Sequence, residues 1–136
     1  MVIATLVASG LGVVSADALM ESLRKHFPDA KLTFNDRSRD KPRTVLYSIW
    51  VEPASDTSFT VVMFDSGDAF GLDGVDDQNE VAAVAIREAL DTGNRVIAGD
   101  RDGSRFVDLV PGMTPMDVRN GWRPMEELSA PESDGS

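Results

Sequence analysis

The densest group of residues able to do chemistry is the acidic segment from Asp65 to Glu80. It holds six carboxylates within sixteen residues: Asp65, Asp68, Asp73, Asp76, Asp77 and Glu80. A calcium loop needs oxygen ligands at its first, third and fifth positions, a glycine at the sixth and a glutamate at the twelfth. No register of this segment meets that pattern, so we expect no tight metal site and no bound cofactor.

Two apolar residues, Phe70 and Leu72, stand inside the acidic segment. Either they fold back onto the core, or they form an apolar anchor within an acidic rim. Rim charges accelerate the encounter with a partner of opposite charge, and a few buried anchors supply most of the affinity. The segment therefore predicts a partner-binding surface, and its candidate residues are Asp65, Asp68, Phe70, Leu72, Asp73, Asp76 and Asp77.

The net charge of −10 is unevenly distributed along the chain. Residues 1–45 carry seven Lys and Arg against five Asp and Glu, whereas residues 46–136 carry six against eighteen. A field of that sign repels nucleic-acid phosphate and anionic lipid, and it attracts a basic partner. We therefore expect a small acidic protein-binding module, such as an inhibitor or immunity-type protein that neutralises a basic protein.

A basic segment offers an alternative binding site, this time for an anion. Four cationic side chains lie close together, namely Arg37, Arg39, Lys41 and Arg43. The segment is polar and contains a proline, so we expect an exposed loop. Tyr47 and Trp50 follow on a predicted strand, and RNA-binding sheets stack bases on paired aromatic residues. Residues three apart on a strand point to opposite faces, however, which argues against a nucleic-acid platform.

An enzyme with a carboxylate-only active site is the second alternative. The chain has no cysteine, which excludes thiolate chemistry and disulfides, and its single histidine, His26, has no acidic orienter or fellow ligand in the local sequence. No serine stands in a G-x-S-x-G or S-x-x-K pattern. Gly10 and Gly12 do not complete a phosphate-binding motif. A pair of carboxylates leaves no local signature, so the sequence names no catalytic residue.

The elements that position these residues are arranged around the stretch from Arg43 to Asp65. It contains two runs rich in β-branched and aromatic residues, separated by a short Pro, Ser and Asp connection, which is typical of two adjacent antiparallel strands. We expect them at the centre of a sheet. Alternation places Val45, Tyr47, Ile49 and Val51 on one face and Leu46 and Trp50 on the other.

The remaining pattern predicts an α+β fold. Further strands are expected at residues 2–8, 31–35, 94–98 and 104–110, and helices at 15–27, 78–90 and 114–121. Apolar residues that include Leu19 and Leu23 recur at helical spacing in the first helix and predict a stripe that faces the sheet. Thr114 is the expected cap of the third helix, with Pro115 at its first position. We expect Asp77 and Glu80 to form a capping box at the second helix. The resulting order, β-α-β-β-β-α-β-β-α, favours a mostly antiparallel sheet with the two main helices packed on one face, a single-domain sandwich. One or two parallel strand pairs are compatible with this order.

The 136 residues correspond to one domain, which we place at residues 1–125. Residues 126–136 are rich in Ser, Pro, Gly and acidic residues, which predicts a disordered acidic tail. The apolar start of the chain has no Lys or Arg before Arg24 and is interrupted by Gly10 and Gly12, so we expect neither a signal peptide nor a membrane span. A cytoplasmic location follows as an expectation, and the sequence does not determine the oligomeric state.

Overall fold

The computed structural model describes residues 3–8, 15–65, 69–90, 93, 95–100 and 102–127, and of residues 3–8 and 76 it describes the backbone. Its strands are β1 (Ile3–Ala8), β2 (Lys31–Asp36), β3 (Val45–Glu52), β4 (Phe59–Phe64), β5 (Ala69–Leu72), β6 (Val96–Asp100), β7 (Arg105–Leu109) and β8 (Arg123–Pro124). Its helices are α1 (Ala16–His26), α2 (Asp76–Ala89) and α3 (Pro115–Asn120).

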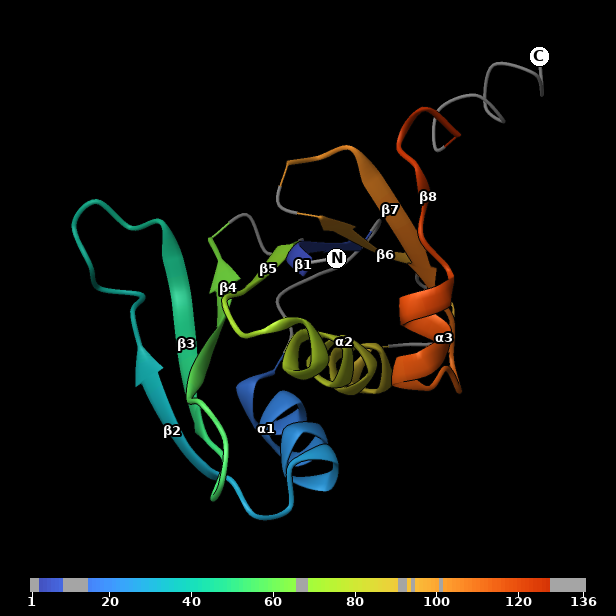
Figure 1. Cartoon of the computed structure of the whole chain (residues 1–136). Coiled ribbons are helices and arrows are strands. Elements are labelled where there is room, and N and C mark those ends of the chain that lie inside the picture. Colours follow the sequence, from blue (N-terminus) through green and yellow to red (C-terminus); the bar gives the residue numbers. More distant parts are fainter. Residues whose placement is uncertain are drawn as a thin grey trace.

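All eight strands belong to one sheet, in the order β2-β3-β4-β5-β1-β6-β7-β8. Every neighbouring pair is antiparallel, so none of the described strands forms the parallel pair that the element order allowed. The sheet curves around the helices, which lie together on one side of it (Figure 1). The predicted α+β class and the order of its elements are therefore confirmed, and β5 and β8 are short strands added to that order.

The centre of the sheet is not where the sequence placed it. The strands from the stretch Arg43–Asp65 are the second and third of the eight, whereas β5 and β1 occupy the middle. The missed strand β5 explains the shift. It pairs with both β4 and β1, and thereby joins the hairpins on either side into one sheet.

The core lies between the sheet and the two main helices. Leu19 and Leu23 of α1 and Ile86 of α2 are fully buried in the same cluster as Ile49 of β3 and Val61 of β4. This is the apolar stripe that the helical spacing predicted. Small residues on the facing sides, including Ser22 and Ala85, let the helices approach closely, and the Ser22 hydroxyl donates to the Ala85 carbonyl at 2.5 Å.

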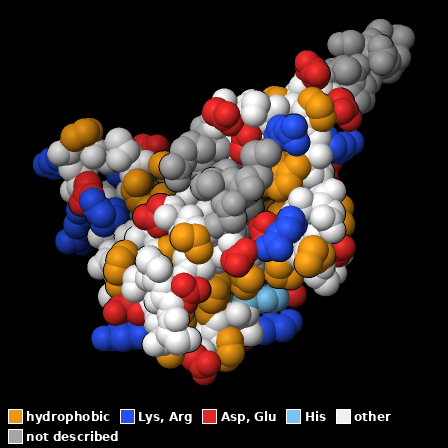
Figure 2. Space-filling view, viewed as in Figure 1, with side chains coloured by type: hydrophobic (Ala, Val, Ile, Leu, Met, Phe, Trp, Pro, Cys, Tyr) orange, Lys and Arg blue, Asp and Glu red, His pale blue; other side chains and the backbone are white. Residues whose placement is uncertain are grey.

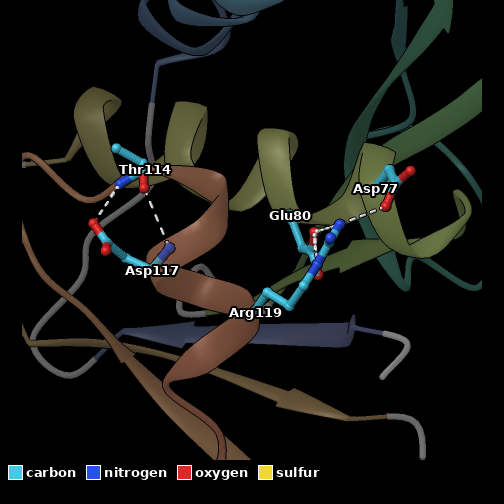
Figure 3. A network of polar contacts seen from close by, with 5 residues as sticks. All are labelled: Asp77, Glu80, Thr114, Asp117 and Arg119. Atoms are coloured by element: carbon cyan, nitrogen blue, oxygen red, sulfur yellow. Dashed lines mark hydrogen bonds and ion pairs between the residues drawn. The ribbon is translucent and has the colours of Figure 1, made fainter.

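Helix α3 begins as predicted. Thr114 is its N-cap and Pro115 its first residue. The Asp117 amide donates to Thr114 Oγ1 at 3.2 Å, and the Thr114 amide donates to Asp117 Oδ2 at 2.9 Å (Figure 3). These two reciprocal bonds satisfy amides that a helix start otherwise leaves without partners.

Helix α2 begins differently from the prediction. Its N-cap is Val75, so the capping box of Asp77 and Glu80 was wrong. The buried amide side chains of Gln78 and Asn79 fold back instead. The Val75 amide donates to Gln78 Oε1 at 3.3 Å, and the Gly74 amide donates to Asn79 Oδ1 at 3.0 Å. The side-chain amides therefore accept the hydrogen bonds at this helix start. The carboxylates of Asp77 and Glu80 remain available for other contacts.

The predicted tail begins at Glu126, and from residue 128 onward it lies outside the described residues. The described end of the chain is held to the sheet, because the Met125 amide donates to the Ser104 carbonyl at 2.9 Å. Just before it, β8 pairs with β7.

Candidate functional site

The candidate site lies on the outer face of the sheet, by which we mean the face turned away from α1 and α2. Side chains alternate along β3 and β4, so Ile49 and Val61 point to the helices while Trp50 and Val62 point outward. Trp50 is 39% exposed, a large exposed fraction for this side chain. The outer face therefore carries apolar side chains that neither main helix covers.

A hollow of about 220 Å³ opens on this face, lined by Thr60, Val62, Gly71, Leu72 and Asp73. We call it the outer hollow. Trp50 stands beside it, because Trp50 is the direct cross-strand partner of Thr60. Gly71 is the direct partner of Val62. The hollow thus lies over β4 and β5, and β3 is the next strand beyond β4.

Gly71 shapes the outer hollow because it has no side chain. A Cβ atom at this position would lie 2.8 Å from Val62 Cγ2 and 3.1 Å from Phe64 Cζ. Both distances are shorter than ordinary van der Waals contacts, so Val62 and the Phe64 ring pack directly on the Gly71 backbone. This part of the lining is therefore apolar and closely packed.

Asp73 supplies the charge at the outer hollow. It follows β5 directly and is exposed. Its Oδ1 accepts a hydrogen bond of 2.6 Å from the Thr60 amide, which ties the end of β5 to the start of β4. Within the described part of the chain, Asp73 Oδ2 has no hydrogen-bond partner. The Asp73 carboxylate is thus held in place with one oxygen available, near the apolar lining of the hollow and the exposed indole of Trp50.

The two predicted apolar anchors are buried. Phe70 is 1% exposed and Leu72 is 5% exposed, and both belong to the core cluster. Alternation in β5 turns these two residues toward the helices, so they fold back onto the core and cannot anchor a partner. In the acidic segment, the exposed large apolar residue is instead Val75, at 52%.

The predicted carboxylates are only partly brought together. Asp65 and Asp77 are exposed, and Asp73 lies at the outer hollow. Asp68, and the side chain of Asp76, lie outside the described residues.

Asp77 takes part in an ion-pair network with Arg119 of α3. The Arg119 guanidinium lies 2.6 Å from Asp77 Oδ1 and 2.8 Å from Oε1 of the buried Glu80 (Figure 3). The Glu80 carboxylate, followed by Asp77, raises the pKa of Arg119. Arg119 thus neutralises part of the acidic segment.

The basic segment between β2 and β3 is exposed, as predicted. Figure 2 shows blue side chains gathered over the connection between β2 and β3. Arg37, Arg39, Lys41 and Arg43 are all exposed. Arg37 Nε pairs with Asp40 Oδ2 at 2.7 Å. Hydrogen bonds from the Ser38 hydroxyl and amide lower the pKa of Asp36, so these carboxylates offset part of the charge that an anion would meet.

The single histidine, His26, contacts a carboxylate that is distant from it in the sequence. His26 Nε2 lies 2.7 Å from Glu88 Oε2, in a contact that joins the exposed ends of α1 and α2. This hydrogen bond from His26 lowers the pKa of Glu88. In the described ranges, no group of three or more His, Asp or Glu residues could hold a metal ion. No described helix is long and apolar enough to cross a membrane.

Four residues of the site, namely Trp50, Thr60, Val62 and Gly71, were not among the predicted site residues. The alternation of β3 placed Trp50 on the face opposite Ile49, which was the available signal. Gly71 lies inside a strand, where a glycine often marks the close approach of other groups. That signal was hidden because no strand was predicted at the residues that form β5.

Comparisons with protein-family models, curated proteins and solved structures find no match for this chain.

Proposed function

We propose that the protein is a binding module for a basic protein, and that the outer hollow receives a lysine or arginine side chain of that partner. The observation that carries the proposal is the combination of Asp73, Trp50 and an apolar lining around one hollow. Neutralising a basic partner by covering its charged surface is an inhibitor-type activity, and that is the activity we propose.

A long cationic side chain matches each part of the hollow. Its aliphatic stem gains from apolar surface, which Val62 and the ring of Phe64 provide near Gly71. Its charged head is attracted to the available oxygen of Asp73. An indole such as that of Trp50 is the most favourable aromatic partner for a cation. A volume of about 220 Å³ suits one side chain and is small for a drug-sized ligand.

The charge of the whole chain supports the same class of partner. At −10, the protein attracts basic surfaces over long range and accelerates their encounter. Trp50 takes the anchoring role that the sequence had assigned to Phe70, because Trp50 is exposed and Phe70 is not. Tryptophan is also among the residues most often found at energetic hot spots.

An NMR titration with short peptides tests the proposal. A peptide with a single lysine should shift the indole signal of Trp50 and the amide signals of Thr60 and Gly71. The same peptide with norleucine or glutamate in place of lysine should shift them much less. Asp73→Asn should weaken the affinity for the lysine peptide by about fivefold, equivalent to roughly 1 kcal/mol of binding free energy.

Asp56→Asn is the matched control, because Asp56 is an exposed aspartate in the connection between β3 and β4 and does not line the hollow. It should leave peptide binding unchanged. Equal losses for the two variants would mean that only the overall charge attracts the peptide. Equal shifts with the lysine and glutamate peptides would contradict the proposal.

A further inference from the structure

Strand β2 is an edge of the sheet, and no described strand pairs with its second side. It is the first strand in the sheet order, and β3 is its neighbour. Five of its six residues are exposed and Leu32 is half-buried. Figure 1 shows β2 at one margin of the sheet. An edge of this kind presents backbone groups that can pair with another strand.

The backbone geometry identifies which groups are free to pair. The Arg37 amide donates to the Leu46 carbonyl at 3.0 Å, just beyond the last residue of β2. Backbone groups alternate in direction along an antiparallel strand, so those of Lys31, Thr33 and Asn35 also point to β3. The groups of Leu32, Phe34 and Asp36 therefore point away from the sheet.

Phe34 is an unusual residue for such an edge. Its ring is 44% exposed, although it lies on the helix side of the sheet, 5.7 Å from the ring of Tyr47. Leu32 lies on the same face two residues earlier, half-buried. The free edge is thus apolar on one face, and it carries no proline that would block pairing.

From this geometry we infer that β2 pairs with β2 of a second copy of the chain, in an antiparallel arrangement centred on Thr33. The two-fold axis then stands perpendicular to the sheet, so each face continues into the same face of the second copy. Leu32 of one copy lies opposite Phe34 of the other, and Phe34 of the first copy lies opposite Leu32 of the second. These pairs use the free backbone groups and cover the exposed ring.

The sequence of β2 selects this register over its neighbour. Centring on Thr33 places Lys31 opposite the neutral Asn35 of the second copy. Centring on Phe34 would place Lys31 opposite Arg37 and Leu32 opposite Asp36. Like charges directly opposite each other are unfavourable, so that register is less stable. The inferred pairing leaves both outer hollows open, and it does not depend on the proposed function.

A single engineered cysteine tests the pairing, because the chain has no cysteine of its own. In the inferred dimer, the two Thr33 residues form a pair without backbone hydrogen bonds, with Cα atoms about 4.5 Å apart. That spacing permits a disulfide. Thr33→Cys should therefore form a covalent dimer on mild oxidation. Asn35→Cys is the matched control, since the two Asn35 residues would be about 14 Å apart and should remain unlinked.

Analytical ultracentrifugation of the unmodified chain provides the second readout. The interface is small, so a dimer should appear with rising protein concentration. Phe34→Lys should remain folded and monomeric, whereas Met116→Lys, at a residue 55% exposed on α3, should dimerise normally. A wild-type chain that stays monomeric at every concentration overturns the inference. If the Asn35→Cys variant cross-linked as fast as the Thr33→Cys variant, the register centred on Thr33 would be wrong.

Discussion

Arg119 of α3 holds the buried carboxylate of Glu80 of α2, with Nη2 and Oε1 2.8 Å apart and a second hydrogen bond from Nε. The Glu80 side chain is only 3% exposed. A buried carboxylate that loses its cation is left without compensation, which is costly. This contact joins the last helix to the rest of the fold.

We expect Arg119→Met to lower the free energy of unfolding, because the buried Glu80 carboxylate loses its cation. Arg95→Met should cost less than about 1 kcal/mol, because the Arg95 and Asp108 pair is more exposed. Urea unfolding measures the loss of stability in both variants. Adding Glu80→Gln to Arg119→Met should recover part of the lost stability, because the buried charge is then removed as well. If Arg119→Met lost no more stability than Arg95→Met, the Glu80 contact would contribute little.

Phe70 is a core residue, and its truncation should show this. We expect Phe70→Ala to cost about 3 to 5 kcal/mol, as large-to-small changes at buried aromatic residues do. Val75→Ala, in the same acidic segment but at a 52% exposed residue, should cost less than about 0.5 kcal/mol. Thermal unfolding of the two variants measures the difference. Similar melting temperatures would restore Phe70 as a candidate anchor.

Tyr47 is the only tyrosine in the chain, so its ionisation can be followed directly by ultraviolet absorbance. Burial raises its pKa to about 12. The unfolded chain ionises nearer the ordinary value of about 10, so the stabilisation from keeping Tyr47 neutral is complete below that pH. It is lost as the pH rises from about 10 to about 12, by roughly 2 to 3 kcal/mol. A titration midpoint near 10 in the folded protein would contradict this burial.

Gly71 leaves no room for a side chain. Gly71→Ala should cost about 1 to 3 kcal/mol, because the new methyl group would press on Val62 and Phe64. Gly93→Ala is the control, since a Cβ there meets nothing within 4 Å. Denaturant midpoints measure both variants. If Gly71→Ala were as stable as the wild type, the Phe64 ring would have to move aside readily, and the outer hollow would not be rigid.

Local patterns predicted most of the fold. The stripe containing Leu19 and Leu23 identified α1, and Thr114 with Pro115 identified α3, because capping and periodicity depend on nearby residues. Strand β5 was missed because it is four residues long and its neighbours are acidic. Its pairing with β1 joins residues that are far apart in the sequence, and no local pattern reports such a contact.

The candidate site could be predicted only in part. Asp73 was identified from the charge of its segment, and alternation placed Trp50 on the face opposite Ile49 without showing which face the helices cover. The outer hollow itself depends on Gly71 packing beside Val62, which requires the register of β4 and β5. The burial of Phe70 was left open for the same reason, because the sequence predicted no strand there and so no face for its side chain.

The most direct test of the proposed function is the set of intermolecular nuclear Overhauser effects between the protein and the single-lysine peptide. We predict contacts from the lysine methylene protons to the Trp50 indole and to the Val62 methyl groups, and weaker contacts in Asp73→Asn but not in Asp56→Asn. Contacts confined to other surfaces, such as the side of α2 near Asp77, would contradict the assignment of the outer hollow as the binding site.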